Sequence, residues 1–247
     1  MTLLPFISIK LTREDVLICM EGATSSSFPV KELDTAICEA NELIRPAAAC
    51  QWVRVVCLKP GLVTVRSETG NDRPPDDQIP DTQNTAAPIT LETGESSHIW
   101  RHARKILVSV VTIGPLLDQC IRERNLLRDP LGGYLLDCAG LAALRKVGTR
   151  VCHLAETEAR RRKWGVGYMV GPGGTKGWPL KDQAKVCSLV SLDPIGVKID
   201  AQGGLSPLKT ISGLIPIGPG YKRNTVGSTC RYCGSRETCN MGDIRWG

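Results

Sequence analysis

The sequence predicts an α+β fold in which helices pack on a mostly antiparallel, twisted sheet. Segments with the pattern of strands alternate with segments whose apolar residues recur at helical spacing, but they do not follow the regular intervals of βαβ units. The composition, with 42% hydrophobic and 23% charged residues, is that of a globular chain. Its 247 residues are enough for one large domain or two small ones.

We expect a small α/β unit over residues 1–66. Apolar side chains at positions 30, 33, 37, 40 and 44 recur at helical spacing, and Pro46 ends the predicted helix. Residues 51–58 alternate in polarity, and Pro60-Gly61 leads into a second apolar run at 62–65. Two such runs around a Pro-Gly turn predict a hairpin.

A polar stretch separates this unit from the rest of the chain. Residues 67–94 contain four prolines and few large apolar side chains before Ile89. Such a composition cannot bury enough apolar surface to order itself, so we expect a flexible linker or insertion.

Residues 95–220 are predicted to form the core. Its most regular strand is 106–112, a continuous β-branched run typical of a buried strand. Helices are expected from the turn at Ile113-Gly114-Pro115 to about Leu127, and over 131–164, where small residues suit close packing. The other elements expected here are a helix capped by Ser96 and Ser97 and ending at Arg104, a strand at 165–170, a helix at 181–192, and strands at 195–199 and 210–217.

The charge pattern argues against nucleic acid as a partner. The net charge is +6, but the basic residues do not gather in a recognisable nucleic-acid-binding module. The one dense run, 160–163, follows Glu156 and Glu158 at a predicted helix C-terminus. It is either a solvated helix end, where the dipole favours cations, or a patch for phosphate or an acidic partner.

We expect a cytoplasmic protein without a membrane span. No apolar run approaches the roughly 18 residues that a spanning helix needs. The N-terminus lacks the basic-then-apolar layout of a secretory signal. Eleven cysteines in such a chain indicate thiols or metal ligands rather than disulfides.

The last segment, 221–247, is a cysteine-rich tail in which Cys230, Cys233 and Cys239 form a C-x2-C-x5-C pattern. Three thiolates at this spacing suit zinc with a fourth ligand, or an iron–sulfur cluster such as a cubane [4Fe–4S] cluster with one open iron. The alternative is three surface cysteines that hold no metal.

Two further patterns remain open on the residues alone. The glycine-rich segment Gly171–Gly177 matches neither common phosphate-binding pattern, so it is either a turn or a ligand loop. His98 and His102 stand four residues apart, which places them on one face if the segment is helical. They are either an exposed helix face or a shared metal pair.

The ordered set of segments resembles the activation (reactivation) domain of cobalamin-dependent methionine synthase, and more closely the short stand-alone proteins built on that domain. The resemblance covers most of residues 90–220 and, more faintly, the N-terminal unit. The matching stretches are Val16-Leu17 through Gly22, Val108–Gly114, Leu135–Gly140, Gly171–Gln183, Ile195-Gly196-Val197 and Leu205–Gly213. The C-terminal cysteines are similar to clusters that end some stand-alone members.

The resemblance implies an α+β activation-domain fold that binds S-adenosylmethionine and presents it to cob(II)alamin for reductive remethylation. It implies ligand contacts for residues in and after the glycine-rich loop, namely Gly171, Pro172, Gly173, Gly174, Thr175, Asp182 and Gln183. The family's loop arginine and tyrosine are replaced by Val170 and Thr175, and Arg145 stands where many members have glutamate.

From these features we expect an accessory protein for a corrinoid (cobalamin) methyltransferase system. It would dock on a corrinoid-binding protein or methyltransferase and assist reductive reactivation, either with electrons from a tail iron–sulfur cluster or with a separate electron donor. One alternative is an S-adenosylmethionine-binding methyl donor to cob(II)alamin. Another is a non-catalytic binding protein with a structural zinc.

Overall fold

The computed structural model describes residues 2–20, 30–68 and 87–239. Within them, seven strands form one sheet in the order β4-β3-β2-β5-β9-β6, with β1 paired to β2 outside this path. All of these pairings are antiparallel, as is that of the small β7–β8 ribbon. The strands are β1 (Thr2–Leu4), β2 (Ala47–Lys59), β3 (Leu62–Ser67), β4 (Ile89–Glu92), β5 (Lys105–Thr112), β6 (Gly165–Val166), β7 (Lys198–Ile199), β8 (Leu205–Ser206) and β9 (Thr210–Gly218).

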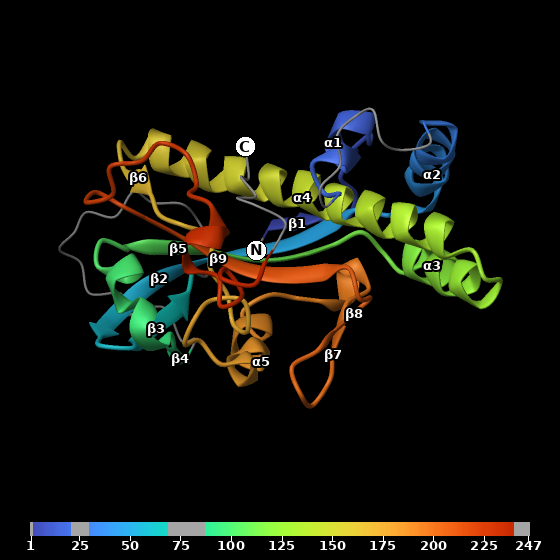
Figure 1. The fold of residues 1–247 in the computed structure, drawn as a ribbon. Coiled ribbons are helices and arrows are strands. Elements are labelled where there is room, and N and C mark those ends of the chain that lie inside the picture. Colours follow the sequence, from blue (N-terminus) through green and yellow to red (C-terminus); the bar gives the residue numbers. More distant parts are fainter. Residues whose placement is uncertain (1, 21–29, 69–86, 240–247) are drawn as a thin grey trace.

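Helices cover this sheet, so the predicted α+β class is confirmed (Figure 1). The long helix α4 crosses one face together with α1, α2 and α3, and the short α5 lies on the other side. The helices are α1 (Arg13–Leu17), α2 (Val30–Leu43), α3 (Leu116–Leu126), α4 (Pro130–Arg161) and α5 (Gln183–Cys187), and the 3-10 turns are η1 (Gly94–Trp100), η2 (Leu180–Asp182), η3 (Asp193–Ile195) and η4 (Thr229–Tyr232).

Strand β5 lies inside the sheet between β2 and β9, and every one of its residues is buried. Leu107 and Val111 pack in the core on the α4 side, whereas Ile106, Val108 and Val110 pack in the core on the α5 side. Alternate side chains of a strand point to opposite faces, so a continuous apolar run can supply both cores. The predicted strand at 106–112 is confirmed.

Helix α4 begins at a capping residue followed by a proline. Asp129 caps its first turn by accepting a hydrogen bond from the Gly132 amide at 2.9 Å, and Pro130 occupies the first helical position. Gly140 allows a close approach, because a Cβ atom there would lie 2.3 Å from the Lys209 side chain. The predicted helices at 30–44, 116–127 and 131–164 are all confirmed.

Several shorter elements differ from the prediction. The expected helix at 181–192 is reduced to η2 and the five residues of α5, and the expected strand at 195–199 to the two residues of β7. The predicted short helix ending at Arg104 is a 3-10 turn, preceded by Thr93.

The expected strand at 165–170 ends at Val166. The next residue, Gly167, donates a hydrogen bond to the Pro216 carbonyl at 2.8 Å. Proline has no amide hydrogen to return this bond, so the ladder is interrupted there.

The predicted boundaries at residues 66 and 94 do not coincide with breaks in the sheet. Strand β4 lies inside the expected linker at 67–94 and pairs with β3, while residues 69–86 lie outside the described residues. Strand β2 from the expected N-terminal unit pairs with β5 along its first eight residues, from Ala47 opposite Thr112 to Arg54 opposite Lys105. In the part of the chain that the structure describes, the two regions therefore share one sheet.

No helix in the described segments is long and apolar enough to cross a membrane.

Candidate functional site

The glycine-rich loop is closed by its own hydrogen bonds. The hydroxyl of Thr175 accepts a hydrogen bond from the Gly171 amide at 3.0 Å, and the Thr175 amide donates to the Gly171 carbonyl at 3.1 Å. Gly173 adopts a φ of 74° and donates to the Trp178 carbonyl at 3.0 Å. Such a positive φ favours glycine. Pro172 and Thr175 are buried, so the exposed residues of the loop are Gly173, Gly174, Lys176 and Gly177.

Asp182 lies fully buried behind this loop. One carboxylate oxygen accepts hydrogen bonds from the Glu92 amide and, at 3.2 Å, from the Trp178 indole. The other oxygen forms an ion pair with Lys185 at 2.7 Å. Burial alone would raise the pKa of Asp182, but Lys185 and the two hydrogen bonds outweigh it and leave the pKa below its usual value.

Gln183 is also buried, and its side-chain oxygen accepts a hydrogen bond from the Ser212 hydroxyl at 3.0 Å. Asp182 thus connects the loop to β4, and Gln183 connects it to β9. Both Asp182 carboxylate oxygens and the side-chain oxygen of Gln183 contact protein partners, so both residues support the loop in this arrangement. Their predicted ligand contacts stay a prediction.

The other stretches that carry the resemblance are also tied together by buried contacts. The Nζ atom of Lys209 lies 2.6 Å from the Asp137 carboxylate and 3.3 Å from that of Asp118. These ion pairs join the turn before β9 to α4 and α3. Lys209 and Asp118 are both buried, so the contacts secure the scaffold.

The C-terminal tail lies against the glycine-rich loop, which joins two features that the sequence analysis treated separately. The Lys176 amide donates to the Tyr232 carbonyl at 2.8 Å, and the Gly234 amide donates to the Gly174 carbonyl at 3.0 Å. Thr175 and Cys233 form an isolated antiparallel bridge between these bonds. The tail therefore continues the surface formed by the loop.

Aromatic and cationic side chains surround this junction. Tyr232 stacks edge to face on Tyr168, with ring centroids 4.9 Å apart, and its ring lies 5.3 Å from that of His98. The guanidinium groups of Arg223 and Arg231 lie 5.3 and 5.9 Å from the Tyr168 ring. Sequence reasoning missed this cluster, because its members are far apart in the chain and share no local pattern. We call the loop, the tail residues 228–234 and this cluster the loop–tail surface.

The predicted metal ligands do not converge. Within residues 2–20, 30–68 and 87–239, no three His, Cys, Asp or Glu side chains form a group that could hold a metal ion. Cys239 is exposed, while Cys230 and Cys233 are half-buried. This arrangement does not fit a cluster or zinc ion on all three cysteines, so the predicted iron–sulfur or zinc site is not supported by the structure.

The two histidines are not a ligand pair either. His98 packs against Tyr232, whereas His102 packs against Tyr221 with ring centroids 5.7 Å apart. Their side chains thus serve separate aromatic contacts, which does not support the interpretation as a shared metal pair.

The three positions that depart from the family pattern are also separated. Val170 is buried in the core on the α5 side, and Thr175 is used within the loop. Arg145 lines a cavity to which neither the loop nor the tail contributes. These three residues therefore do not come together at the loop–tail surface.

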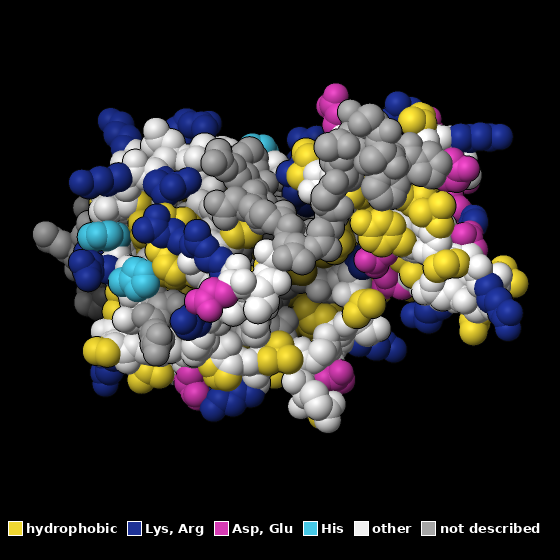
Figure 2. Space-filling model, viewed as in Figure 1, with side chains coloured by type: hydrophobic (Ala, Val, Ile, Leu, Met, Phe, Trp, Pro, Cys, Tyr) yellow, Lys and Arg dark blue, Asp and Glu magenta, His cyan; other side chains and the backbone are white. Residues whose placement is uncertain are grey.

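In Figure 2, Lys and Arg side chains lie over β6, and at the opposite end, over α2 and α3, hydrophobic side chains are exposed among charged ones of both signs. Leu126 and Leu127 are among the exposed apolar residues at that end.

Comparison with known proteins gives a likeness among solved structures and none in the other two comparisons. No protein-family model and no curated protein matches the sequence. Among solved structures, the chain is similar to the crystal structure of the MetH reactivation domain bound to AdoHcy, with 13% sequence identity and a TM-score of 0.46. The match covers 81% of this chain and 67% of that one. The MetH reactivation domain is thus a structural neighbour of this protein.

Proposed function

We propose that this chain is an accessory protein of a corrinoid methyltransferase system, which docks on a corrinoid-bearing partner through the loop–tail surface and assists its reductive reactivation. The observation that carries the proposal is that stretches resembling the reactivation domain, distant in the sequence, meet here. The side chain of Gln183, in one of these stretches, bonds to that of Ser212 in another. Two of the stretches that carry the resemblance therefore meet next to the loop.

The groups exposed at this surface are suited to binding and orientation. Tyr232 and Tyr168 present aromatic edges, and Arg231 is an exposed cation held over one of the rings. Aromatic and arginine side chains are enriched where protein interfaces gain their affinity. The chemistry of remethylation belongs to the corrinoid and the methyl donor, while this chain would supply position.

Docking is favoured over the alternative of a methyl donor. Val170 is buried in the core, the Thr175 hydroxyl bonds within the loop, and Arg145 lines a separate cavity, so none of the three is placed to hold a ligand at the loop. A ligand that binds only the native state must raise its melting temperature. A rise with S-adenosylmethionine, absent with adenosine at the same concentration, would support the methyl-donor alternative.

The proposal is tested with a purified corrinoid methyltransferase module, loaded with cobalamin and reduced to the cob(II) state. We expect binding by biolayer interferometry to be weakened about tenfold or more by Arg231→Gln, since removing an interface arginine typically costs this much. Arg122→Gln is the matched control, because it removes the same charge from an exposed position on α3.

Failure of the loaded module to bind would contradict the docking proposal. Equal affinities for the Arg231→Gln and Arg122→Gln variants would place the interface elsewhere. Cofactor reduction and remethylation are followed separately by the visible spectrum of the corrinoid, which distinguishes docking from assistance in the reaction.

A further inference from the structure

A cavity of about 550 Å³ lies between the N-terminal segment and α4. Residues 8–10 form one wall, and residues 145–153 of α4 contribute the other. No residue of the loop–tail surface lines it. Its volume falls within the range of small-molecule binding sites.

The helical wall carries basic side chains in two adjacent rows. Arg145, Thr149 and His153 follow one another at intervals of four residues, and Lys146 and Arg150 form the neighbouring row. Residues four apart share a helix face, so this spacing directs all five toward one side. Lys10 faces them from the opposite wall.

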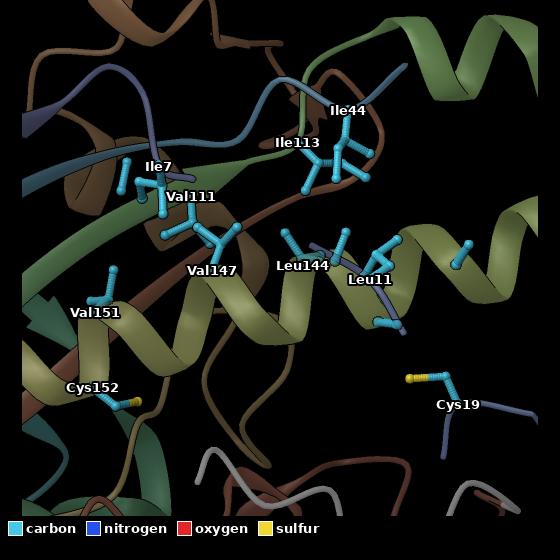
Figure 3. Packing of buried hydrophobic residues seen from close by; sticks show 14 of the residues in the cluster. Ile7, Leu11, Cys19, Ile44, Val111, Ile113, Leu144, Val147, Val151 and Cys152 are labelled. Atoms are coloured by element: carbon cyan, nitrogen blue, oxygen red, sulfur yellow. The ribbon is translucent and has the colours of Figure 1, made fainter. Parts of the chain in front are cut away.

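The opposite wall is held in place by buried anchors on both sides of residues 8–10. Ile7 and Leu11 are buried in the core cluster that contains Val147 of α4 (Figure 3). The Ile7 amide donates to the Pro46 carbonyl at 2.9 Å, and the Leu11 amide donates to the Asn41 side chain at 2.8 Å. The cavity is therefore preformed, which reduces the entropy lost when a ligand binds.

Most of the positive charge in this cavity has no counter-charge among the described residues. Lys146 is paired with Asp15 at 2.7 Å, and the His153 ring contacts Glu156 at 3.0 Å. Lys10, Arg145 and Arg150 form no ion pair with any residue in the described ranges.

Arg145 is only partly exposed, so its guanidinium is less well hydrated than a surface charge. Clefts lined by charge of one sign concentrate ions of the other sign. The cavity thus presents, on rigid walls, three cations that form no ion pair within the part of the chain that the structure describes.

We propose that this cavity binds a small anionic molecule that carries two or more phosphate groups. Arginine forms paired hydrogen bonds with phosphate oxygens, and Arg145 and Arg150 supply two such groups from adjacent rows of one helix. Several cations in one cavity favour a ligand with several negative charges over a single carboxylate. This proposal is independent of docking on a corrinoid partner.

The test is isothermal titration of the full chain with tripolyphosphate and with ATP, at low and high salt. We expect Arg145→Gln and Arg150→Gln each to weaken binding about tenfold or more, because a hydrogen bond to a charged group typically contributes this much. Binding should also weaken at high salt. The matched control is Arg122→Gln, which makes the same change of charge outside the cavity and should leave binding unchanged.

A melting curve of each variant shows whether it is folded. If the Arg145→Gln variant does not fold, the Arg150→Gln variant alone tests the proposal, because Arg150 is exposed. The proposal is overturned if neither probe binds at low salt, or if Arg122→Gln weakens binding as much as Arg150→Gln. Tighter binding of a poly-glutamate peptide than of both phosphate probes would overturn it in favour of an acidic protein segment.

Discussion

Asp182 offers a sharp test of how the glycine-rich loop is supported. In the Asp182→Ala variant, the Trp178 indole and the Glu92 amide both lose their acceptor. A buried donor left without a partner costs about 1–3 kcal/mol. Loss of the ion pair between Asp182 and Lys185 costs less, because the Lys185 side chain is 40% exposed. Its Nζ atom also lies 3.3 Å from the Glu92 carboxylate, which can replace Asp182 as the partner.

Together these losses predict a decrease in the free energy of unfolding of about 3 kcal/mol. For a chain of this size that corresponds to a melting temperature lower by roughly 6–12 °C. In Asp182→Asn the side-chain carbonyl oxygen can accept both hydrogen bonds, since both donors bond to the same oxygen of Asp182, so only the ion pair with Lys185 is lost and a smaller decrease of about 1 kcal/mol is expected. The assays are urea denaturation followed by tryptophan fluorescence, and thermal melting.

Asp193→Ala serves as the matched control, because Asp193 is exposed and its change should stay within about 0.5 kcal/mol. The reasoning is refuted if Asp182→Ala changes the free energy of unfolding no more than this control does. An Asp182→Asn variant less stable than Asp182→Ala would equally show that the carboxylate does not act through its accepted hydrogen bonds.

Three further predictions follow from other parts of the molecule. Gly94→Ala should lower the free energy of unfolding, measured by urea denaturation, by about 2–4 kcal/mol. The reason is that Gly94 has a φ of 57° and that a Cβ atom there would lie 2.1 Å from the Gly177 carbonyl oxygen. In the control Gly174→Ala, the added Cβ atom meets nothing within 4 Å, so the change should be nearly neutral. Burial raises the pKa of Glu158, but Arg161, Arg162 and Lys105 outweigh it and lower the pKa to about 2. Because the folded-state pKa is depressed, Glu158 contributes about 3 kcal/mol to the free energy of unfolding above pH 4.5, and this contribution is lost as the pH falls towards 2. Glu158→Gln should remove this acid-dependent part of the melting curve, and an unchanged pH profile would contradict the assignment. The cysteine spacing predicts that anaerobically purified protein contains iron with sulfide, or zinc. Loss of this metal in the Cys230→Ser variant would show that the tail rearranges to bind it. Protein purified without metal would refute the prediction of a metal site.

The elements that could be predicted are those whose pattern lies within one segment. The burial of β5 follows from its unbroken β-branched run, and α4 follows from its apolar and small residues. These signals are local, so they are readable without knowing what packs against them. The short elements after the glycine-rich loop were overestimated, because their length depends on contacts with β4 and β9.

The sequence by itself determined the long helices and long strands, and the residues of the loop and tail. Only the tertiary structure decided how they meet. The pairing of Thr175 with Cys233, the contact of Tyr168 with Tyr232 and the cavity between Lys10 and α4 join residues more than fifty positions apart. Backbone and side-chain pairing over such separations depends on which faces are buried together, and local periodicity contains no information about that.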